Sequence, residues 1–312
     1  MIEITFLGTI SGIPTKERNH PAIVLEYYSW RKHTLLFDCG EGTQRQMMIA
    51  GISYMDIDKI FITHWHADHF AGLIPLLSTL NVEKRKRKLE IYAPQAKKFV
   101  KRILSLGYFP LRYEVKAINI PFKGKKMKKI LEEKEFEIYS IPVCHTVPAV
   151  AYVFKEKDKW NIDLKKLKEL GLKRGRWLKK IKEKGYAIVN GRKVRIEEIA
   201  NLAKGIKVVY SGDTKPCKTI EIASKDADLL IHDATFFEEE KSKKTGHSDI
   251  IKACEIAKKA NVKFLVLTHI SRRYSEKIRE IEKVAKEHFK NSVIAYDFMK
   301  IRIDKKGIKI VK

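Results

Sequence analysis

The chain has 312 residues, of which 44% are hydrophobic, so it can bury a core as one large domain or two small ones. No apolar run approaches the roughly 18 residues of a membrane-spanning helix, and the first residues do not resemble a signal peptide, which predicts a cytoplasmic protein without membrane contact. Lys and Arg number 64 against 38 Asp and Glu. The net charge of +26 fits either a polyanionic partner such as nucleic acid or a merely basic surface.

Strand-like and helix-like segments alternate along the chain, which opens on the strand-like MIEITFLGT. Apolar runs that suit strands buried on both faces follow at residues 59–63, 89–94, 135–143, 206–212, 227–234 and 263–269. Helical patterns occupy residues 96–107, 248–260 and 275–289. The last two begin at Ser248 and Ser275, which we interpret as N-caps. This alternation predicts an α/β fold whose ligand site lies at the C-terminal ends of strands.

The segment 155–184 interrupts the alternation. It holds 13 Lys/Arg and 5 Asp/Glu, and its short leucine stripe is broken at Gly171 and Gly175. The pattern predicts a helical hairpin with too few apolar residues to be core, and hence a projecting basic arm. A solvated surface excursion without function is the alternative interpretation.

The four cysteines are scattered and form no CxxC pair, which fits a reducing cytosol. Each of them is interpreted as a small buried hydrophobic residue. They are Cys39, Cys144, Cys217 and Cys254.

The stretch FITHWHADHFAGL, residues 61–73, follows an apolar run and carries four metal-ligand side chains within six positions. They are His64, His66, Asp68 and His69. Imidazole and carboxylate without thiolate suit a catalytic ion with an open coordination position better than a structural zinc. Four residues exceed the usual three ligands of one catalytic ion, so two ions are expected if further ligands arrive. His145, Asp213 and His269 each follow a strand-like run and can supply them.

THWHADH matches the HxHxDH signature of the metallo-β-lactamase superfamily, and His, Asp and His follow in that superfamily's order. Four further stretches resemble ribonuclease Z, the tRNA 3′-processing endonuclease, in its short form. They are FLGTISGIPTKERN (6–19), LFDCGEGTQRQM (36–47), SGDT (211–214) and THISRRY (268–274). The resemblance runs from residue 5 to about residue 300.

This resemblance implies a four-layer αβ/βα sandwich in a single domain, residues 1–312, with the site at the edge between two sheets. It also implies that residues 155–184 are the exosite, an inserted basic arm that grips tRNA, with Lys173, Arg174 and Arg176 in contact with it. The family's arm often has a Gly-Pro-rich turn, and KELGLKRGRW has no proline. The arm's conformation is therefore left open.

The resemblance further assigns the ligands. His64, His66 and His145 would hold a first metal ion. A second ion would be held by Asp68, His69 and His269, with Asp213 between the two. Zinc, two ions per subunit, is the expected cofactor, and manganese and iron are the alternatives.

The implied reaction removes the 3′ trailer from precursor tRNA by a metal-activated water, cutting after the discriminator base to leave a tRNA 3′-hydroxyl and a trailer 5′-phosphate. Asp68 would orient the water or take its proton. His247, oriented by Asp233, would stabilise the transition state or protonate the leaving oxygen. The stretches HDAT (232–235) and GHSD (246–249) depart from the corresponding loops of bacterial relatives. A hydrogen bond at the start of a helix, without a catalytic role, is the alternative for His247.

In the PTKERN loop, phosphate and 3′-end contacts are expected of three residues, for which a local turn role is the alternative. They are Lys16, Arg18 and Asn19. The resemblance also implies a homodimer, one subunit's arm serving the other's site.

Three rival functions stay open. A metallo-β-lactamase-fold phosphodiesterase acting on another RNA or on a small molecule would keep the ligands without needing the basic arm. An RNA exonuclease or mRNA endonuclease of this fold would usually carry a further RNA-handling domain. A non-catalytic RNA-binding module would explain the charge but not seven aligned ligand-type residues.

Overall fold

The computed structural model describes residues 1–108, 111–237 and 245–311, and the chain forms two compact units. The first unit combines Met1–Phe154 with Lys207–Lys312, and the second is Lys155–Ile206. The smaller unit is thus an insertion in the sequence of the larger one.

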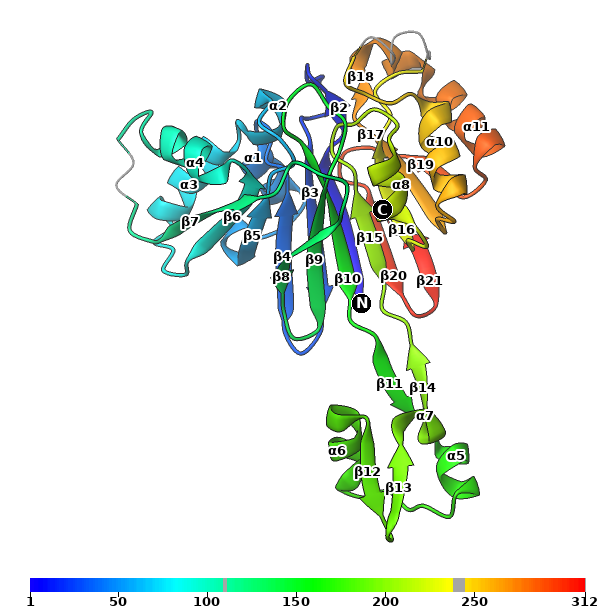
Figure 1. Cartoon of the computed structure of the whole chain (residues 1–312). Helices are drawn as coiled ribbons and strands as arrows, with labels where there is room; N and C mark the ends of the chain where they lie inside the picture. Colours follow the sequence, from blue (N-terminus) through cyan, green and yellow to red (C-terminus); the bar gives the residue numbers. More distant parts are fainter. Residues whose placement is uncertain (109–110, 238–244, 312) are drawn as a thin grey trace. The chain divides into compact units, whose positions relative to one another are not determined.

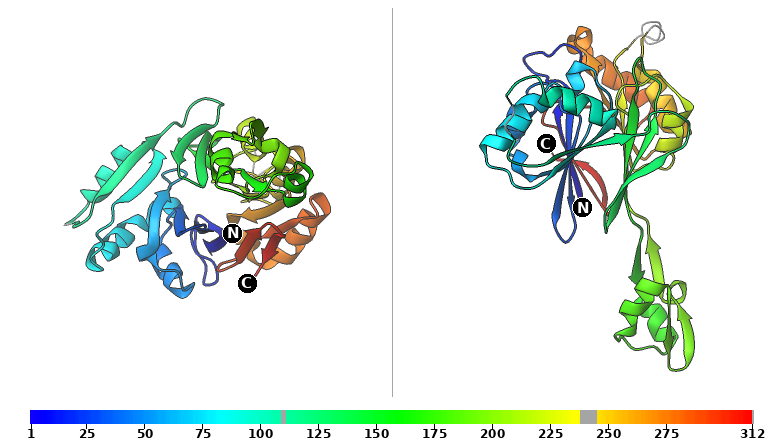
Figure 2. Two further views of the ribbon diagram at one scale, coloured as in Figure 1. Left: turned by 90° about the horizontal axis from the view of Figure 1, so that it is seen from below. Right: turned by 60° about the vertical axis from the view of Figure 1, so that its left-hand side comes forward.

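Two β-sheets packed face to face form the centre of the first unit (Figures 1 and 2). The eight-stranded sheet has the order β21 (Gly307–Ile310), β20 (Lys300–Asp304), β1 (Ile2–Gly8), β3 (Ala22–Tyr28), β4 (Lys32–Phe37), β5 (Ile57–Phe61), β6 (Leu89–Pro94), β7 (Val115–Ile120). The seven-stranded sheet has the order β19 (Ser292–Ile294), β17 (Phe264–Thr268), β16 (Leu229–Asp233), β15 (Lys207–Tyr210), β10 (Val150–Glu156), β9 (Phe136–Pro142), β8 (Lys128–Glu132).

Helices cover the outer face of each sheet. Those on the eight-stranded sheet are α1 (Thr43–Ile49), α3 (Leu73–Val82) and α4 (Ala96–Leu104), and they share one apolar cluster with its strands. Those on the seven-stranded sheet are α8 (Lys218–Ser224), α10 (Ile250–Lys259) and α11 (Ile278–His288), with a second cluster. The layers therefore run helix, sheet, sheet, helix, which confirms the predicted αβ/βα sandwich.

Aromatic rings fill the space between the sheets. Phe37 on β4 stacks on Phe61 of β5 with centroids 5.0 Å apart, and Tyr152 of the other sheet tilts against both rings. The Tyr152 hydroxyl donates hydrogen bonds to the carbonyls of Ile62 and Tyr92, at 2.8 and 3.1 Å. Because a buried hydroxyl needs a partner, these two bonds fix how the sheets face each other just beneath the loop that follows β5.

The predicted strands and helices are present with small shifts at their ends, and the segment 89–94 is reproduced as β6. The two predicted N-caps are wrong. Asp249 caps α10, its carboxylate accepting from the Lys252 N–H at 2.9 Å, while the Ser248 hydroxyl donates to the carbonyl of Thr214. Ser275 lies in the 3-10 turn η2 (Arg272–Lys277), ahead of α11. At α10 the helix begins one residue later than predicted, and at α11 the chain takes a 3-10 turn before the helix begins.

The second unit has its own small core. Its elements are β11 (Lys159–Ile162), α5 (Leu164–Glu169), α6 (Trp177–Lys184), β12 (Tyr186–Val189), β13 (Arg192–Arg195), α7 (Ile196–Ile199) and β14 (Ala200–Ala203). Strand β11 pairs with β14, and β12 with β13, both antiparallel. Leu167 and Ile181 from the helices pack with Val194 and Ile199.

The predicted arm, residues 155–184, covers only the first part of this unit, which continues to Ile206. The boundary was placed too early because the charge run ends near Lys184, whereas the apolar residues that complete the core, such as Val194 and Ile199, follow it. The two helices form as predicted, but strands accompany them. Among the described residues, no helix combines the length and the apolar character that spanning a bilayer requires.

Candidate metal centre

The end of β5 delivers four of the predicted ligands. His64 and His66 lie in the loop that follows the strand, and Asp68 and His69 lie on α2 (Ala67–Phe70), a single turn of helix. Because the helix turns at once, Asp68 and His69 point back toward the two loop histidines. The ligand side chains of the HxHxDH motif thus converge on one point instead of being distributed around a long helix.

The seven-stranded sheet delivers the other three. His145 follows β9, Asp213 follows β15, and His269 follows β17. Gly212 takes φ +56°, and a Cβ there would lie 2.7 Å from the Thr63 side chain. Only glycine allows Asp213 to approach the β5 loop this closely.

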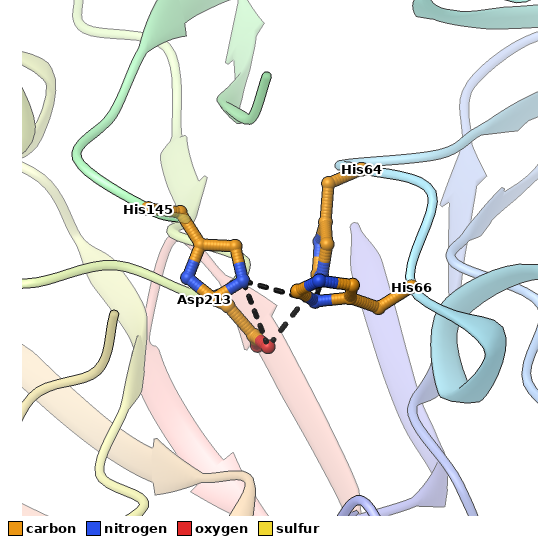
Figure 3. Close-up of side chains that lie close together, drawn as sticks. All are labelled: His64, His66, His145 and Asp213. Atoms are coloured by element: carbon orange, nitrogen blue, oxygen red, sulfur yellow. Dashed lines mark hydrogen bonds and ion pairs between the residues drawn. The ribbon is translucent and has the colours of Figure 1, made fainter. Parts of the chain in front are cut away.

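Three imidazoles and one carboxylate form the first cluster (Figure 3). His66 Nδ1 lies 3.1 Å from both His64 Nε2 and His145 Nε2. Asp213 Oδ2 lies 3.6 Å from His64 Nε2 and 4.0 Å from His145 Nε2. The ring nitrogens face one another and the carboxylate, as the close-up shows.

The second cluster shares Asp213 with the first. His69 Nε2 lies 3.3 Å from His269 Nε2 and 3.3 Å from Asp213 Oδ2. Asp68 Oδ2 lies 3.5 Å from His269 Nε2, and Asp213 Oδ1 lies 3.5 Å from His269 Nδ1. The structure therefore brings all seven predicted ligands together, with Asp213 between the two sets.

The outward nitrogens of four histidines are held by oxygen atoms. His69 Nδ1 donates to Asp38 Oδ2 at 2.7 Å, and His145 Nδ1 donates to the carbonyl of Gly246 at 2.8 Å. His64 Nδ1 lies 3.0 Å from the Thr63 hydroxyl. In the same way His269 Nδ1 lies 2.8 Å from the hydroxyl of Thr235. Such bonds place the ring proton on Nδ1 and leave the Nε2 lone pair toward the centre.

This donor set fits a divalent metal. Two Nε2 lone pairs face each other at 3.3 Å between His69 and His269, with no proton between them if both Nδ1 atoms are protonated. A buried contact of that kind is unfavourable unless a cation lies between the nitrogens. Imidazole and carboxylate ligands suit zinc, manganese or iron, and no thiolate is present in the metal-ligand groups of the described residues.

Sequence reasoning missed Asp38 as a site residue, although it lies in LFDCGEGTQRQM. It is fully buried, and its carboxylate accepts from the Thr63 N–H and hydroxyl, the Tyr210 hydroxyl and His69. Its φ of +55° is rare for a residue other than glycine. His269 shares this conformation, with φ +63°. Strained backbone at two site positions is typical of a functional centre, and it is invisible in the sequence.

His247 and Asp233, whose pairing the sequence left open, are in contact. His247 Nδ1 donates to Asp233 Oδ2 at 3.0 Å and lies 3.8 Å from Asp213 Oδ2. Asp233 is held in turn by the backbone N–H of Thr214 at 3.0 Å and of Thr235 at 2.9 Å. The imidazole of His247 is 19% exposed, so it can meet a substrate, whereas Asp233 cannot.

Burial and the neighbouring charges set the pKa values of this centre. Burial, and after it the charge of the nearby His69, lowers the pKa of His64 well below its usual value. Burial also lowers the pKa of His145. Both rings are therefore neutral and able to bind a metal ion. Burial alone would raise the pKa of Asp213, but the surrounding histidines hold it well below the usual range. For His247, burial lowers the pKa while the Asp233 carboxylate raises it, and the balance is a value of about 9.

Comparison with known proteins identifies the family. The chain is 42% identical to ribonuclease Z of Thermococcus sibiricus and 44% identical to ribonuclease Z of Pyrococcus horikoshii, over 98% of each chain in both cases. This chain belongs to the ribonuclease Z family. It is therefore a metal-dependent endoribonuclease, a hydrolase of phosphodiester bonds.

Solved structures share this fold, and two family models match parts of the chain. The structure of human tRNase Z, short form, is 27% identical, with a TM-score of 0.69 over 97% of this chain and 99% of that one. The metallo-β-lactamase fold protein YhfI of Bacillus subtilis, 21% identical with a TM-score of 0.67 over 96% and 98% of the two chains, shows the same fold. Residues 2–158 match the model of the anti-Pycsar protein Apyc1, and residues 194–270 match that of the beta-lactamase superfamily domain.

The PTKERN loop has exposed and partly buried side chains. Lys16 is exposed. The Arg18 guanidinium instead donates to the Thr9 hydroxyl and the Ala295 carbonyl, at 3.1 and 2.9 Å. Asn19 donates through its side chain to the carbonyl of Glu41 at 2.7 Å. Arg18 and Asn19 therefore anchor the loop, and the RNA contacts expected of Lys16, Arg18 and Asn19 stay a prediction.

The proposed RNA contacts of the second unit, Lys173, Arg174 and Arg176, are exposed and lie between α5 and α6. The Trp177 indole N–H donates to the carbonyl of Lys173 at 3.2 Å, which orders this connection. The structure thus leaves all three cationic heads accessible to a partner.

Replacing Asp38 with Asn should weaken metal binding without touching a ligand. The amide cannot accept from His69, Thr63 and Tyr210 together, so the His69 ring loses its fixed orientation. We expect the affinity for zinc to fall by about 10–100-fold. Competition titration with a chelating dye measures it, with Asp304→Asn, a partly exposed position at the end of β20, as the matched control. Equal zinc affinity in the Asp38 variant and the parent would contradict this role.

Proposed function

We propose that this chain is a cytoplasmic, zinc-dependent endoribonuclease that removes the 3′ trailer from precursor tRNA, cutting after the discriminator base. The observation that carries the proposal is the convergence of seven ligand-type side chains, with Asp213 at their centre, in a chain of the ribonuclease Z family. The tRNA substrate is supported by the name of the human tRNase Z structure and by the strongly basic sequence.

Two metal sites follow from the clusters. We assign His64, His66 and His145 to the first and Asp68, His69 and His269 to the second. Asp213 is assigned to both, since its Oδ2 lies within 4.0 Å of ring nitrogens from each set. When bound there, divalent ions supply a water acidified to a pKa of about 7 and neutralise charge on the phosphate.

Asp68 orients the attacking water in this proposal. Its Oδ2 accepts a hydrogen bond from the backbone N–H of Gly12 at 3.1 Å and faces His269. Burial would raise the pKa of Asp68, but hydrogen bonding and charge from His269 and His69 hold it well below the usual range. The carboxylate therefore stays ionised at neutral pH and directs a water lone pair toward phosphorus.

His247 protonates the departing 3′-oxygen of the tRNA. A ring with a pKa of about 9 carries its proton at neutral pH, and its contact with Asp233 keeps Nδ1 engaged and presents Nε2 outward. The products are then a tRNA 3′-hydroxyl and a trailer 5′-phosphate. His247 thus acts in catalysis in this proposal, and the helix-start role is filled by Asp249.

The second unit is the proposed tRNA-binding exosite, with Lys173, Arg174 and Arg176 in contact with backbone phosphates and Lys16 in contact with the RNA near the cut. The same proposal includes a homodimer. In it, the second unit of one subunit binds the tRNA that the other subunit cleaves. Sedimentation equilibrium at micromolar protein tests the dimer.

His66→Ala tests the central assignment. The parent enzyme, incubated with zinc and a 3′-extended precursor tRNA, should yield one cut after the discriminator base. The variant should lose at least about 10³-fold in kcat because a ligand of the first site is missing, while its tRNA affinity stays within about twofold. Comparable cleavage by the variant at saturating zinc or manganese would refute the assignment. A parent that hydrolyses a small phosphodiester but not the tRNA would instead favour the alternative phosphodiesterase.

Asp233→Asn should shift the pH dependence of kcat. The rate falls as His247 loses its proton, so the parent's alkaline limb is expected near pH 9. Removing the Asp233 charge lowers the pKa of His247, and the limb moves to lower pH. A pH profile of single-turnover cleavage measures this, with the zinc content checked by elemental analysis. In His247→Ala the limb should vanish, and a limb that persists unchanged in both variants would exclude His247 as the acid.

Replacing Lys173, Arg174 and Arg176 together by Ala should raise KM for precursor tRNA by about 10-fold or more, because three phosphate contacts are lost, and should flatten its dependence on salt. Hydrolysis of bis(p-nitrophenyl) phosphate should be unchanged. The matched control removes the exposed Lys305, Lys306 and Lys309 of the β20–β21 hairpin. Equal effects of the two triple variants on KM would argue against an exosite.

A further inference from the structure

Two cysteines lie on the segments that carry metal ligands from the seven-stranded sheet. Cys144 directly precedes His145, and Cys217 follows Asp213 by four positions. The two segments are bridged, with Cys144 opposite Lys215 and the Lys215 N–H donating to the Cys144 carbonyl at 2.8 Å. A covalent link at this point would tie together the chains that hold His145 and Asp213.

The side chain of Thr214 brings the two cysteines together. Its hydroxyl accepts from the Cys144 N–H at 3.2 Å and lies 3.7 Å from the Cys217 sulfur. Thr214 thus contacts both cysteines, one through its backbone N–H and the other through its sulfur. The bridge between Cys144 and Lys215 and the shared contacts with Thr214 hold the two cysteines on adjoining segments.

Accessibility separates this pair from the remaining cysteines. Cys144 is exposed and Cys217 is partly exposed, whereas Cys39 and Cys254 are buried. The sequence interpretation as small buried hydrophobic residues therefore holds for Cys39 and Cys254 and is wrong for Cys144. A small oxidant can reach the Cys144–Cys217 pair without unfolding of the protein.

The surroundings of Cys217 favour its thiolate. Burial raises the pKa of this thiol, but hydrogen bonds from the Thr219 hydroxyl, the Ile220 backbone and the Thr214 hydroxyl outweigh burial and bring the pKa below its ordinary value. The Thr219 oxygen lies 3.2 Å from the sulfur. Cys217 is thus the sulfur equipped to react first.

We propose that Cys144 and Cys217 form a reversible peroxide-reactive disulfide site beside the metal centre. The Cys217 thiolate attacks one oxygen of hydrogen peroxide, the O–O bond breaks, and a sulfenic acid and hydroxide result. The Cys144 sulfur then attacks the sulfenic sulfur, the S–S bond forms, and the sulfenic oxygen leaves as water with the Cys144 proton. Two thiols and one peroxide give one disulfide and two waters.

The pair protects the segment that holds Asp213. A sulfenic acid without a neighbouring thiol is oxidised further to a sulfinic acid, which adds a permanent charge and cannot be reduced by thiols. Capture by Cys144 stops the oxidation at a bond that a reductant reopens. The role accords with the transient, redox-active character of most cytosolic disulfides.

The test oxidises the full-length, metal-loaded protein with equimolar hydrogen peroxide, blocks free thiols under denaturing conditions, and identifies the products by intact mass and peptide mapping. The parent should lose two of its four thiols and the mass of two hydrogen atoms. It should yield the linked Cys144–Cys217 peptide, and tris(2-carboxyethyl)phosphine should restore all thiols. Cys254→Ser is the matched control and should form the same link.

With a second equivalent of peroxide, Cys144→Ser should gain two oxygen atoms on Cys217 that the phosphine does not remove, whereas the parent treated in the same way should recover its thiols. Cys217→Ser should form no disulfide and react at least about tenfold more slowly. Three results would each overturn the proposal. They are four thiols remaining in the oxidised parent, a disulfide through Cys39 or Cys254, and full recovery of the Cys217 thiol in Cys144→Ser after treatment with the phosphine. These readouts do not depend on RNA cleavage, so their failure is distinct from failure of the proposed function.

Discussion

The buried carboxylate of Asp213 is the constraint on which the site depends. One oxygen, Oδ2, lies 3.3 Å from Nε2 of His69 and 3.6 Å from Nε2 of His64, in a side chain only 3% exposed. Water cannot compensate groups that are buried to this degree, so the carboxylate needs positive charge beside it. Burial would lower the pKa of His69, but the charges of Asp213 and Asp38 raise it well above its usual value, which shows how strongly this position favours a cation. Two bound cations would satisfy every donor at once. The arrangement is therefore a metal site first, and its chemistry follows from that.

The two-sheet sandwich brings the ligand-bearing loops together around Asp213. The β5 loop comes from one sheet, whereas the loops bearing His145, Asp213 and His269 come from the other, so the centre forms only where the sheets meet. Tyr152 joins the sheets by hydrogen bonds, and Asp38 joins them again through Tyr210 while it also orients His69. A rigid core thus fixes side chains from strands that are distant in the sequence, which is what a metal-dependent hydrolase needs.

The sequence predicted most of the ligand set and the layered fold, because strand-end positions and the HxHxDH spacing are local patterns. Asp38 escaped prediction since its role depends on contacts with residues far away in the chain, and a positive φ leaves no mark in the sequence. Arg18 was expected to contact RNA because it lies in the PTKERN loop, and its bond to the carbonyl of Ala295, 277 positions along the chain, could not be foreseen. The end of the inserted unit was missed because the run of basic residues covers only its first part. The apolar residues that complete its core follow this run and have no distinctive pattern. In each case the deciding contacts are long-range.

Anomalous diffraction from crystals of the zinc-loaded enzyme, recorded above and below the zinc absorption edge, tests the central claim most directly. Two anomalous peaks on opposite sides of Asp213 are expected, one against His64, His66 and His145 and the other against Asp68, His69 and His269. A single peak, or peaks away from Asp213, would contradict the account.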